Sequence, residues 1–202
     1  MSLEFRYLFY RFIALCGLIL SSPFLAVAFI AVKIDSPGPF IFKQKRMGKG
    51  KKPFTMYKIR TMVSGAEGLQ VSLKKKNEAD GPVFKIKNDP RFTKVGKFLS
   101  YGALDEIPQL INVIRGEMSL VGPRPLPLEE AKKIPAKYAE RFTVLPGMTS
   151  SWVIHGSHRL TFKEWMRLDI KYARKHPFLK DLYILLYTFI LVLRIIFQPF
   201  FK

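Results

Sequence analysis

The 202-residue sequence contains a single cysteine and few acidic residues. Cys16 lies in an apolar run, which excludes a disulfide framework and a cysteine-based metal site. Any chemistry must therefore use carboxylates, basic groups or the three histidines, His155, His158 and His176, which show no metal-ligand spacing. The sequence also lacks internal repeats and low-complexity segments, and its length suits one domain with or without membrane elements.

The shortage of acidic residues leaves a strongly basic chain. Lys and Arg total 34 against 15 Asp and Glu, which gives a formal net charge of +19. This charge predicts a polyanionic partner: nucleic acid, anionic lipid head groups or a phosphorylated small molecule. Composition alone does not choose among these three classes.

The first long apolar run, residues 12–32, carries no charge and has the length of about 20 residues that a membrane-spanning helix needs. A single-pass anchor is therefore the default. Ser22 and Pro23 lie at its centre, where proline removes a backbone donor and kinks a helix. Basic residues, which mark the cytoplasmic side of a membrane segment, flank both ends. The pattern favours a re-entrant helix bent at Ser22-Pro23. The alternative is a secretory signal cleaved near residues 26–28, although the apolar run continues past that point.

The second apolar run lies at the C-terminal end, over residues 181–202. Polar side chains recur there at helical spacing, at Tyr183, Tyr187, Arg194 and Gln198. Such a narrow polar stripe suits a helix lying in a membrane interface, while a buried core helix and a second span remain alternatives. We expect a membrane protein with three parts: a re-entrant helix (1–35), a catalytic domain (36–180) and a membrane-associated helix (181–202).

The middle of the chain predicts a mostly helical α+β fold. Aromatic and basic residues alternate around Gly48 and Gly50 within residues 39–62, which indicates a β-hairpin. Thr161 and Glu164 form a capping box that opens a helix reaching about residue 175. We expect further helices at 93–100, 108–115 and 128–142, an extended segment at 146–156, and no regular element at 63–90 or in the proline-rich 119–127. The sheet content is too small for a doubly wound fold.

Asp105 and Glu106 are adjacent carboxylates followed by Pro108 and an apolar run. Asp is among the best helix N-caps, worth about 0.5–2 kcal/mol over Ala, so one reading of Asp105 is the start of a helix. The same position suits catalysis, because the amides and dipole there favour a carboxylate and attract phosphate. A second carboxylate can help to hold Mg²⁺, which binds through one or two carboxylates plus substrate phosphates.

Basic residues elsewhere in the chain are candidates for anion binding. Arg124 lies between two prolines on a backbone with few conformations, which suits bidentate anion binding or a surface turn. Lys58 and Arg60 share one face of the predicted strand, as a phosphate-facing pair or as the solvent face of the hairpin. Asp169 lies between basic residues on the helix that follows the capping box, where a surface ion pair is the simple reading.

These segments, taken in order, match a known family. The series is "DSPGPFIFKQKRMG", "PFTMYKIRTM", "NDPRFTKVGKFL", "LDEIPQLINVIRGEMSLVGPRP", "LPGMTSSWVIHG" and "FKEWMRLDIKYA", preceded by an apolar helix broken at Ser-Pro. The sequence closely resembles the small bacterial monotopic phosphoglycosyl transferases, also called bacterial sugar transferases, over about residues 6–193. The ordered run of motifs is far more specific than any one of them.

The resemblance implies an enzyme on the cytoplasmic face of the bacterial inner membrane, held by the re-entrant helix and by several amphipathic interfacial helices. It implies transfer of a sugar phosphate from a UDP-sugar to polyprenyl (undecaprenyl) phosphate, with release of UMP, in glycoconjugate or polysaccharide biosynthesis. Asp105 is then the nucleophile, and Glu106, with Asp105 beside it, helps to hold Mg²⁺. The implied substrate contacts are Lys58, Arg60, Arg91, Arg124 and Asp169.

Three positions depart from the family pattern. Relatives often carry Arg where this chain has Ser100, Ser where it has Ala103, and Arg where it has Ser157. Arg159 lies two residues after Ser157 and is a candidate replacement. The departures bear on substrate contacts and thus on sugar specificity; the sequence does not disclose the sugar, the final glycan or the oligomeric state.

Two other functions are compatible with the composition. One is a membrane-tethered, non-catalytic basic protein that binds nucleic acid or anionic lipid; the chain has no recognisable nucleic-acid motif, so we expect no nucleic-acid partner. The other is a Mg²⁺-dependent hydrolase of nucleotide sugars that uses the same carboxylates.

Overall fold

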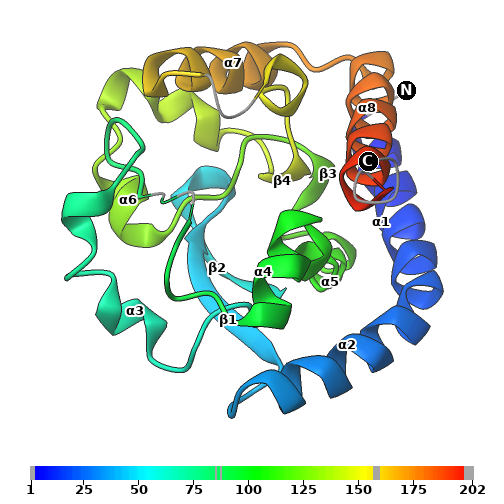
Figure 1. Cartoon of the computed structure of the whole chain (residues 1–202). Helices are drawn as coiled ribbons and strands as arrows, with labels where there is room; N and C mark the ends of the chain where they lie inside the picture. The colour runs from blue at the N-terminus through cyan, green and yellow to red at the C-terminus, as the bar shows by residue number, and fades with distance from the viewer. Residues whose placement is uncertain (1–2, 85, 87, 157–159, 198–202) are drawn as a thin grey trace.

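The computed structural model describes residues 3–84, 86, 88–156 and 160–197. The fold is mostly helical with a β-hairpin near the centre of the view, as the sequence predicts (Figure 1). Helices α1 (Leu3–Leu20) and α2 (Ser22–Asp35) lie along one side of the molecule and below the hairpin in this view. The other helices lie above the hairpin and to its left and right in the same view (Figure 1).

The predicted bend at Ser22-Pro23 is confirmed. Helices α1 and α2 meet at an angle of 57°. Pro23 lies in the first turn of α2, where its missing N–H leaves no helical bond unmade, and the Ser22 hydroxyl donates to the carbonyl of Ile19 (2.7 Å). Within the part of the chain that the structure describes, no single helix has the length and apolarity to cross a membrane, whereas this bent pair meets both criteria together.

The β-hairpin is confirmed as strands β1 (Ile41–Met47) and β2 (Pro53–Ile59), which pair antiparallel across a turn that contains the 3-10 helix η1 (Lys49–Lys51). Helix α5 (Gln109–Ile114) packs on β2 through Asn112, which is fully buried. The Asn112 side chain donates to the carbonyl of Thr55 (2.7 Å) and accepts from the N–H of Tyr57 (3.2 Å). These bonds fix α5 against the strand that carries Lys58.

A second, parallel pair of strands joins a segment where the sequence predicted no regular element to the segment 146–156, which it predicted to be extended. Strand β3 (Ser119–Val121) pairs with β4 (Gly147–Thr149), so the prediction for 119–127 is wrong over its first three residues. Gly122 follows β3 directly, and a Cβ there would lie 2.5 Å from the carbonyl oxygen of Leu145. Glycine therefore allows the chain that leaves β3 to run close beside the chain that enters β4.

The helices in the rest of the domain follow the sequence in part. Helix α4 (Lys94–Tyr101), with Thr93 as its N-cap, matches the helix predicted over 93–100. The capping box at Thr161 opens α7 (Phe162–Arg174) as predicted. The single helix expected over 128–142 is wrong: Pro135 divides it into α6 (Leu128–Lys132) and the 3-10 helix η4 (Ala136–Phe142), because proline disfavours a helical residue before it. Short turns of helix also occur in segments expected to be irregular or extended: α3 (Ala66–Leu69), η2 (Lys74–Lys76) and η5 (Val153–His155).

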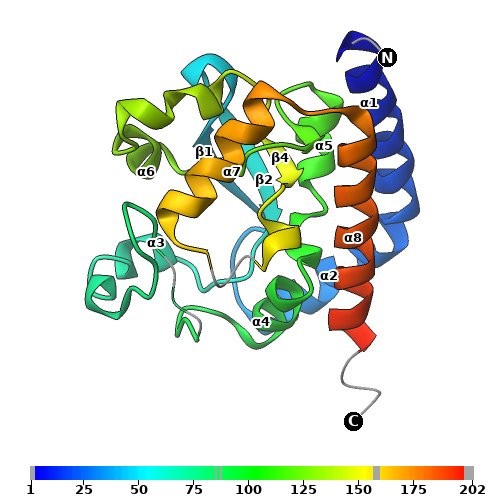
Figure 2. The same cartoon turned by 90° about the horizontal axis from the view of Figure 1, so that it is seen from above.

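Helix α8 (Phe178–Phe197) lies beside α1 in both views (Figures 1 and 2). Ile184 is fully buried in the main core with Tyr10 and Met118, while Tyr183 and Tyr187 on the predicted polar stripe are exposed. Gln198 of that stripe lies outside the described residues. How α8 lies relative to a bilayer stays a prediction.

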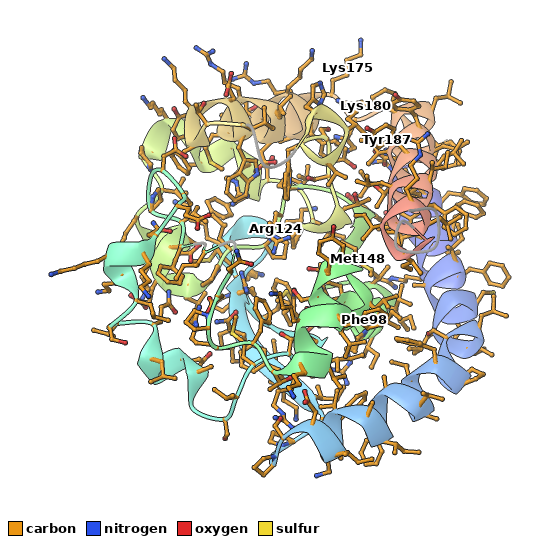
Figure 3. The ribbon with its side chains drawn as sticks, in the orientation of Figure 1. Phe98, Arg124, Met148, Lys175, Lys180 and Tyr187 are labelled. Atoms are coloured by element: carbon orange, nitrogen blue, oxygen red, sulfur yellow. The ribbon has the colours of Figure 1, made fainter. Side chains whose placement is uncertain are left out.

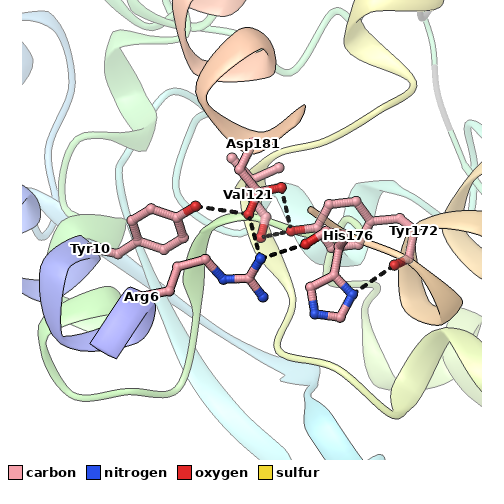
Figure 4. A network of polar contacts seen from close by, with 6 residues as sticks. All are labelled: Arg6, Tyr10, Val121, Tyr172, His176 and Asp181. Atoms are coloured by element: carbon pink, nitrogen blue, oxygen red, sulfur yellow. Dashed lines mark hydrogen bonds and ion pairs between the residues drawn. The ribbon is translucent and has the colours of Figure 1, made fainter. Parts of the chain in front are cut away.

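A buried polar network joins α1, α7, α8 and β3 (Figure 4). The carboxylate of Asp181, with no exposed surface, accepts from the hydroxyls of Tyr10 (2.8 Å) and Tyr172 (2.9 Å). Arg6 lies 3.4 Å from the same carboxylate and donates to the carbonyl of His176 (2.6 Å). The Tyr172 hydroxyl is also 3.0 Å from the carbonyl of Val121, at the end of β3. Hydrogen bonds through Asp181 and Tyr172 thus connect both α1 and α8 to β3, the strand that leads to Arg124.

Candidate active site

The acidic pair lies in a single 3-10 turn, η3 (Leu104–Glu106), between α4 and α5. The N-cap of this turn is Ala103, which has φ +54, and α5 begins only after Pro108. Asp105 is the N-cap of neither η3 nor α5, so the reading of Asp105 as a helix cap is wrong. The left-handed backbone at Ala103 and the proline at 108 break the helix here, and the turn directs a buried Asp105 towards strand β2.

Lys58 on β2 lies between the two carboxylates. Its Nζ is 2.7 Å from Oε1 of Glu106 and 3.4 Å from Oδ2 of Asp105. Arg124, on the loop after β3, lies with Nη1 at 3.9 Å from the same Glu106 oxygen. The structure therefore brings together four residues singled out from the sequence, from β2, η3 and the proline-flanked loop.

A small open cavity adjoins this cluster. Its lining includes Lys58, Glu106 and Arg124, together with Arg46 from β1 and Met148 from β4. Arg124 and Met148 both lie near the centre of the view in Figure 3. The cavity is thus formed where the hairpin, the acidic turn and the β3–β4 pair meet.

The two carboxylates have pKa values shifted in opposite directions. Burial raises the pKa of Asp105, and the neighbouring Glu106 adds to the rise, while Lys58 opposes it. Burial also acts against ionisation of Glu106, but Lys58 and Arg124 together outweigh it and lower the pKa of that carboxyl. Glu106 is therefore held as a stable anion, whereas the anion of Asp105 is destabilised and more basic. Such a divided pair suits one carboxylate for binding a cation and the other for attack.

Asp169 is buried, so its reading as a surface ion pair is wrong, and it contacts this cluster only through Arg141. Its carboxylate accepts from Nε (3.0 Å) and Nη2 (2.8 Å) of Arg141, and both side chains are 2% exposed. Arg141 Nη2 also donates to the backbone carbonyl of Arg124 (2.8 Å). The structure thus places Asp169 as a support for the Arg124 loop. Arg141 was missed from the sequence, because nothing in its local pattern marks it.

Two other predicted substrate contacts lie elsewhere. Strand β2 ends at Ile59, so the alternation that put Arg60 on the face of Lys58 stops before Arg60. Arg60 is buried and donates to the hydroxyl and carbonyl of Ser36 and to the carbonyl of Pro39 (2.7 Å), at the end of α2. The structure does not bring it to the acidic pair.

Arg91 is likewise occupied outside the cluster. It forms an ion pair with Asp89 (2.6 Å) and donates to the carbonyl of Ala66 (3.1 Å). Ser100, where relatives often carry arginine, is partly exposed near the end of α4. Ser157 and Arg159 lie outside the described residues.

The acidic pair offers a donor set that fits Mg²⁺. Over the described residues, no group of three or more His, Cys, Asp or Glu side chains converges on one point. Mg²⁺ does not need such a group, because it commonly binds one or two carboxylates together with substrate phosphates. Asp105 and Glu106 already converge on one cation, the ammonium of Lys58. Their oxygens are hard ligands of the kind that Mg²⁺ prefers.

Comparison with known proteins finds a sugar transferase family and its members. The family model described as bacterial sugar transferase matches residues 2–195. The galactosyl transferase CpsE of Streptococcus agalactiae is 40% identical over 157 residues, 77% of this chain and 35% of the relative. The undecaprenyl-phosphate galactose phosphotransferase of Salmonella typhimurium is 35% identical over 185 residues, 88% of this chain and 38% of the relative.

A third relative is shorter. The UDP-glucose:undecaprenyl-phosphate glucose-1-phosphate transferase of Caulobacter vibrioides is 36% identical over 178 residues, 84% of this chain and 62% of the relative. The chain therefore spans less than two thirds of the length of each of these three proteins. The region matched by the family model, residues 2–195, includes the acidic turn, the hairpin and the Arg124 loop.

Proposed function

Because the chain belongs to the bacterial sugar transferase family, we propose that it transfers a sugar 1-phosphate from a UDP-sugar to undecaprenyl phosphate and releases UMP. The single observation that carries the proposal is the cluster of Asp105, Glu106, Lys58 and Arg124 beside one cavity. The printed names of relatives support these substrate classes. They differ in the sugar, galactose in one and glucose in another, so the sugar is left open.

Asp105 is the nucleophile in this proposal. A carboxylate oxygen attacks the sugar-side phosphorus of the UDP-sugar, the bond from that phosphorus to the bridging oxygen breaks, and UMP leaves with the electron pair. The product is an acyl phosphate that carries the sugar. A phosphate oxygen of undecaprenyl phosphate then attacks the same phosphorus, and the Asp105 carboxylate is released. The raised pKa of Asp105 supports this role, because a more basic carboxylate is the better nucleophile.

The neighbouring charges position and neutralise the reactants. Lys58 holds both carboxylates in the rotamers seen, and Arg124, on its restrained backbone, faces the same cavity as Glu106. A guanidinium there can bind phosphate oxygens bidentately. Mg²⁺ held by Glu106, with Asp105 beside it, would supply further neutralisation of the diphosphate charge. Positioning and charge neutralisation are the main sources of catalysis in phosphoryl transfer.

The proposed place of reaction is the cytoplasmic face of the bacterial inner membrane. The bent α1–α2 pair would enter one leaflet and return, with exposed apolar side chains such as Leu20 (80% exposed) in lipid. Phe98 on α4 is 64% exposed and suits an interfacial contact (Figure 3). The acceptor's long tail could then stay in the bilayer while its phosphate reaches the site.

The test is UMP release from a panel of UDP-sugars, with and without undecaprenyl phosphate, in nanodiscs. We expect sustained release only with the acceptor, and covalent labelling of the chain by one UDP-sugar without it. Asp105→Asn should abolish both, whereas Glu129→Gln, a charge loss at an exposed position, should change neither. An active Asp105→Asn variant would refute the nucleophile. Sustained release without acceptor would identify a hydrolase, and no release from any UDP-sugar would favour a non-catalytic membrane protein.

A further inference from the structure

Arg46 lies where the hairpin meets the loop that carries Arg124. The edge of β1 extends onto that loop: the N–H of Met47 donates to the carbonyl of Leu126 (2.9 Å), and Arg46 forms an antiparallel bridge with Pro127. The Arg46 side chain donates from Nη1 to the carbonyl of Pro125 (3.0 Å). The loop is therefore held at two successive carbonyls, because Arg141 holds that of Arg124.

Most of the hydrogen-bonding capacity of Arg46 is left over. A guanidinium has five N–H donors, and among the described residues Arg46 uses them on a single acceptor, Pro125. The buried Nε of Arg46 has no hydrogen-bond partner among these residues. The Arg46 side chain also forms no ion pair with any of them within 4.0 Å. Burial, with the nearby charge of Arg124, lowers the pKa of Arg46 to about 10, so the group remains a cation at neutral pH. A desolvated cation of this kind is stabilised by an incoming anion.

The charges around the cavity show which cations are available to a ligand. Lys58 is engaged by Asp105 and Glu106. Arg124 touches a carboxylate only at 3.9 Å, and Arg46 touches none, yet both line the cavity. Two guanidinium groups are thus available beside the acidic pair. A nucleoside diphosphate sugar presents two phosphates in sequence, and guanidinium is the side chain best suited to bind each of them.

We infer that Arg46 is a substrate-binding residue that donates to the diphosphate of the nucleotide sugar while it holds the Pro125 carbonyl. This inference rests on the proposed function, and it extends that site by one residue that the sequence motifs did not single out. It assigns the two phosphates to two guanidiniums, Arg124 and Arg46, and leaves Lys58 to orient the carboxylates.

The experiment compares Arg46→Met and Arg46→Lys with Lys45→Met. Lys45 is the preceding residue of β1 and is exposed, so its substitution removes the same charge from the same strand outside the cavity. For each protein, one measures kcat and KM for the active UDP-sugar at saturating undecaprenyl phosphate, and the affinities of UDP, UMP and uridine. Melting temperatures are measured alongside.

For Arg46→Met we expect kcat/KM and UDP affinity to fall about 10- to 100-fold, the range for loss of a charge-assisted hydrogen bond. Uridine, which lacks phosphate, should bind within about threefold of wild type, and Arg46→Lys should recover part of the UDP affinity. Lys45→Met should match wild type in all of these.

Two results would overturn the inference. One is an Arg46→Met protein that behaves as Lys45→Met does. The other is equal loss of UDP and uridine affinity with a lower melting temperature, which would reduce Arg46 to a structural contact. A wild-type chain that binds UDP but turns over no UDP-sugar would refute the proposed function instead, and the UDP–uridine comparison would still decide the case of Arg46.

Discussion

The buried pair of Arg141 and Asp169 allows stability and activity to be separated by mutation. Both side chains are 2% exposed, and Asp169 is the acceptor for two nitrogens of Arg141. Asp169→Ala would leave the guanidinium buried without its carboxylate, which typically costs about 3–5 kcal/mol. For a chain of this length, a loss of that size lowers the melting temperature by roughly 6–20 °C, at about 2–4 °C per kcal/mol. Transferase activity should fall as well, because Arg141 also holds the Arg124 carbonyl.

A double variant, Asp169→Leu with Arg141→Met, is the matched control. Replacing a buried ion pair by apolar side chains of similar volume is often neutral for stability, so the melting temperature should return to within a few degrees of wild type. The bond from Arg141 to the Arg124 carbonyl is absent in this variant, so activity should stay low. Stability would then recover without function.

The assay is thermal unfolding in detergent, followed by tryptophan fluorescence, together with UMP release. Trp165 is a suitable reporter, because its ring centroid lies 6.0 Å from the Arg141 guanidinium carbon. A loss below about 1 kcal/mol for Asp169→Ala would refute the assignment of a buried, paired carboxylate. Recovery of activity together with stability in the double variant would refute the positioning of Arg124 by Arg141.

Three further predictions concern the acidic pair. Asp105→Asn should raise the melting temperature at pH 7, because burial raises the pKa of Asp105 and the ionised carboxylate therefore destabilises the folded state. This gain in melting temperature should shrink as the pH falls through the raised pKa of Asp105, where the wild-type carboxyl becomes protonated. Lys58→Met should move the acid limb of the kcat–pH profile to higher pH, since Lys58 lowers the pKa of both carboxyls. Glu106→Gln should raise the Mg²⁺ concentration for half-maximal activity at least about tenfold, whereas Glu129→Gln should leave it unchanged.

Each of these has a contrary outcome. A melting temperature for Asp105→Asn that is lower than wild type at pH 7 would contradict the raised pKa. An unmoved acid limb in Lys58→Met would show that the titrating group is not the acidic pair. Equal Mg²⁺ dependence in wild type and Glu106→Gln would remove Glu106 from the cation site.

Local sequence rules predicted the elements that depend on neighbouring residues. Three elements follow from the conformational preferences of a few adjacent residues: the bend at Pro23, the hairpin around Gly48 and Gly50, and the capping box at Thr161. The same rules failed where two of them compete. Asp105 is a good cap by type, but the left-handed Ala103 before it places it inside a 3-10 turn.

Contacts between distant segments could not be predicted from local patterns. Arg46 reaches the Pro125 carbonyl across 79 positions, and Arg141 reaches Asp169 across 28. The residues next to each arginine do not indicate its partner, because the packing of the hairpin and of α7 determines which distant group lies within reach. Arg60 illustrates the opposite case: strand alternation predicted its direction, but the strand ends one residue too early.

The network at Asp181 also sets an order of events during synthesis. Tyr10 and Asp181 are 171 positions apart, so at about 5–20 residues per second the ribosome delivers the acceptor roughly 9–34 s after the donor. Throughout that interval the Arg6 guanidinium and the Tyr10 hydroxyl have no Asp181 to contact. Helix α1 is therefore joined to Asp181 only after α8 has begun to form, and the strand that leads to Arg124 acquires this part of its support at the same late stage.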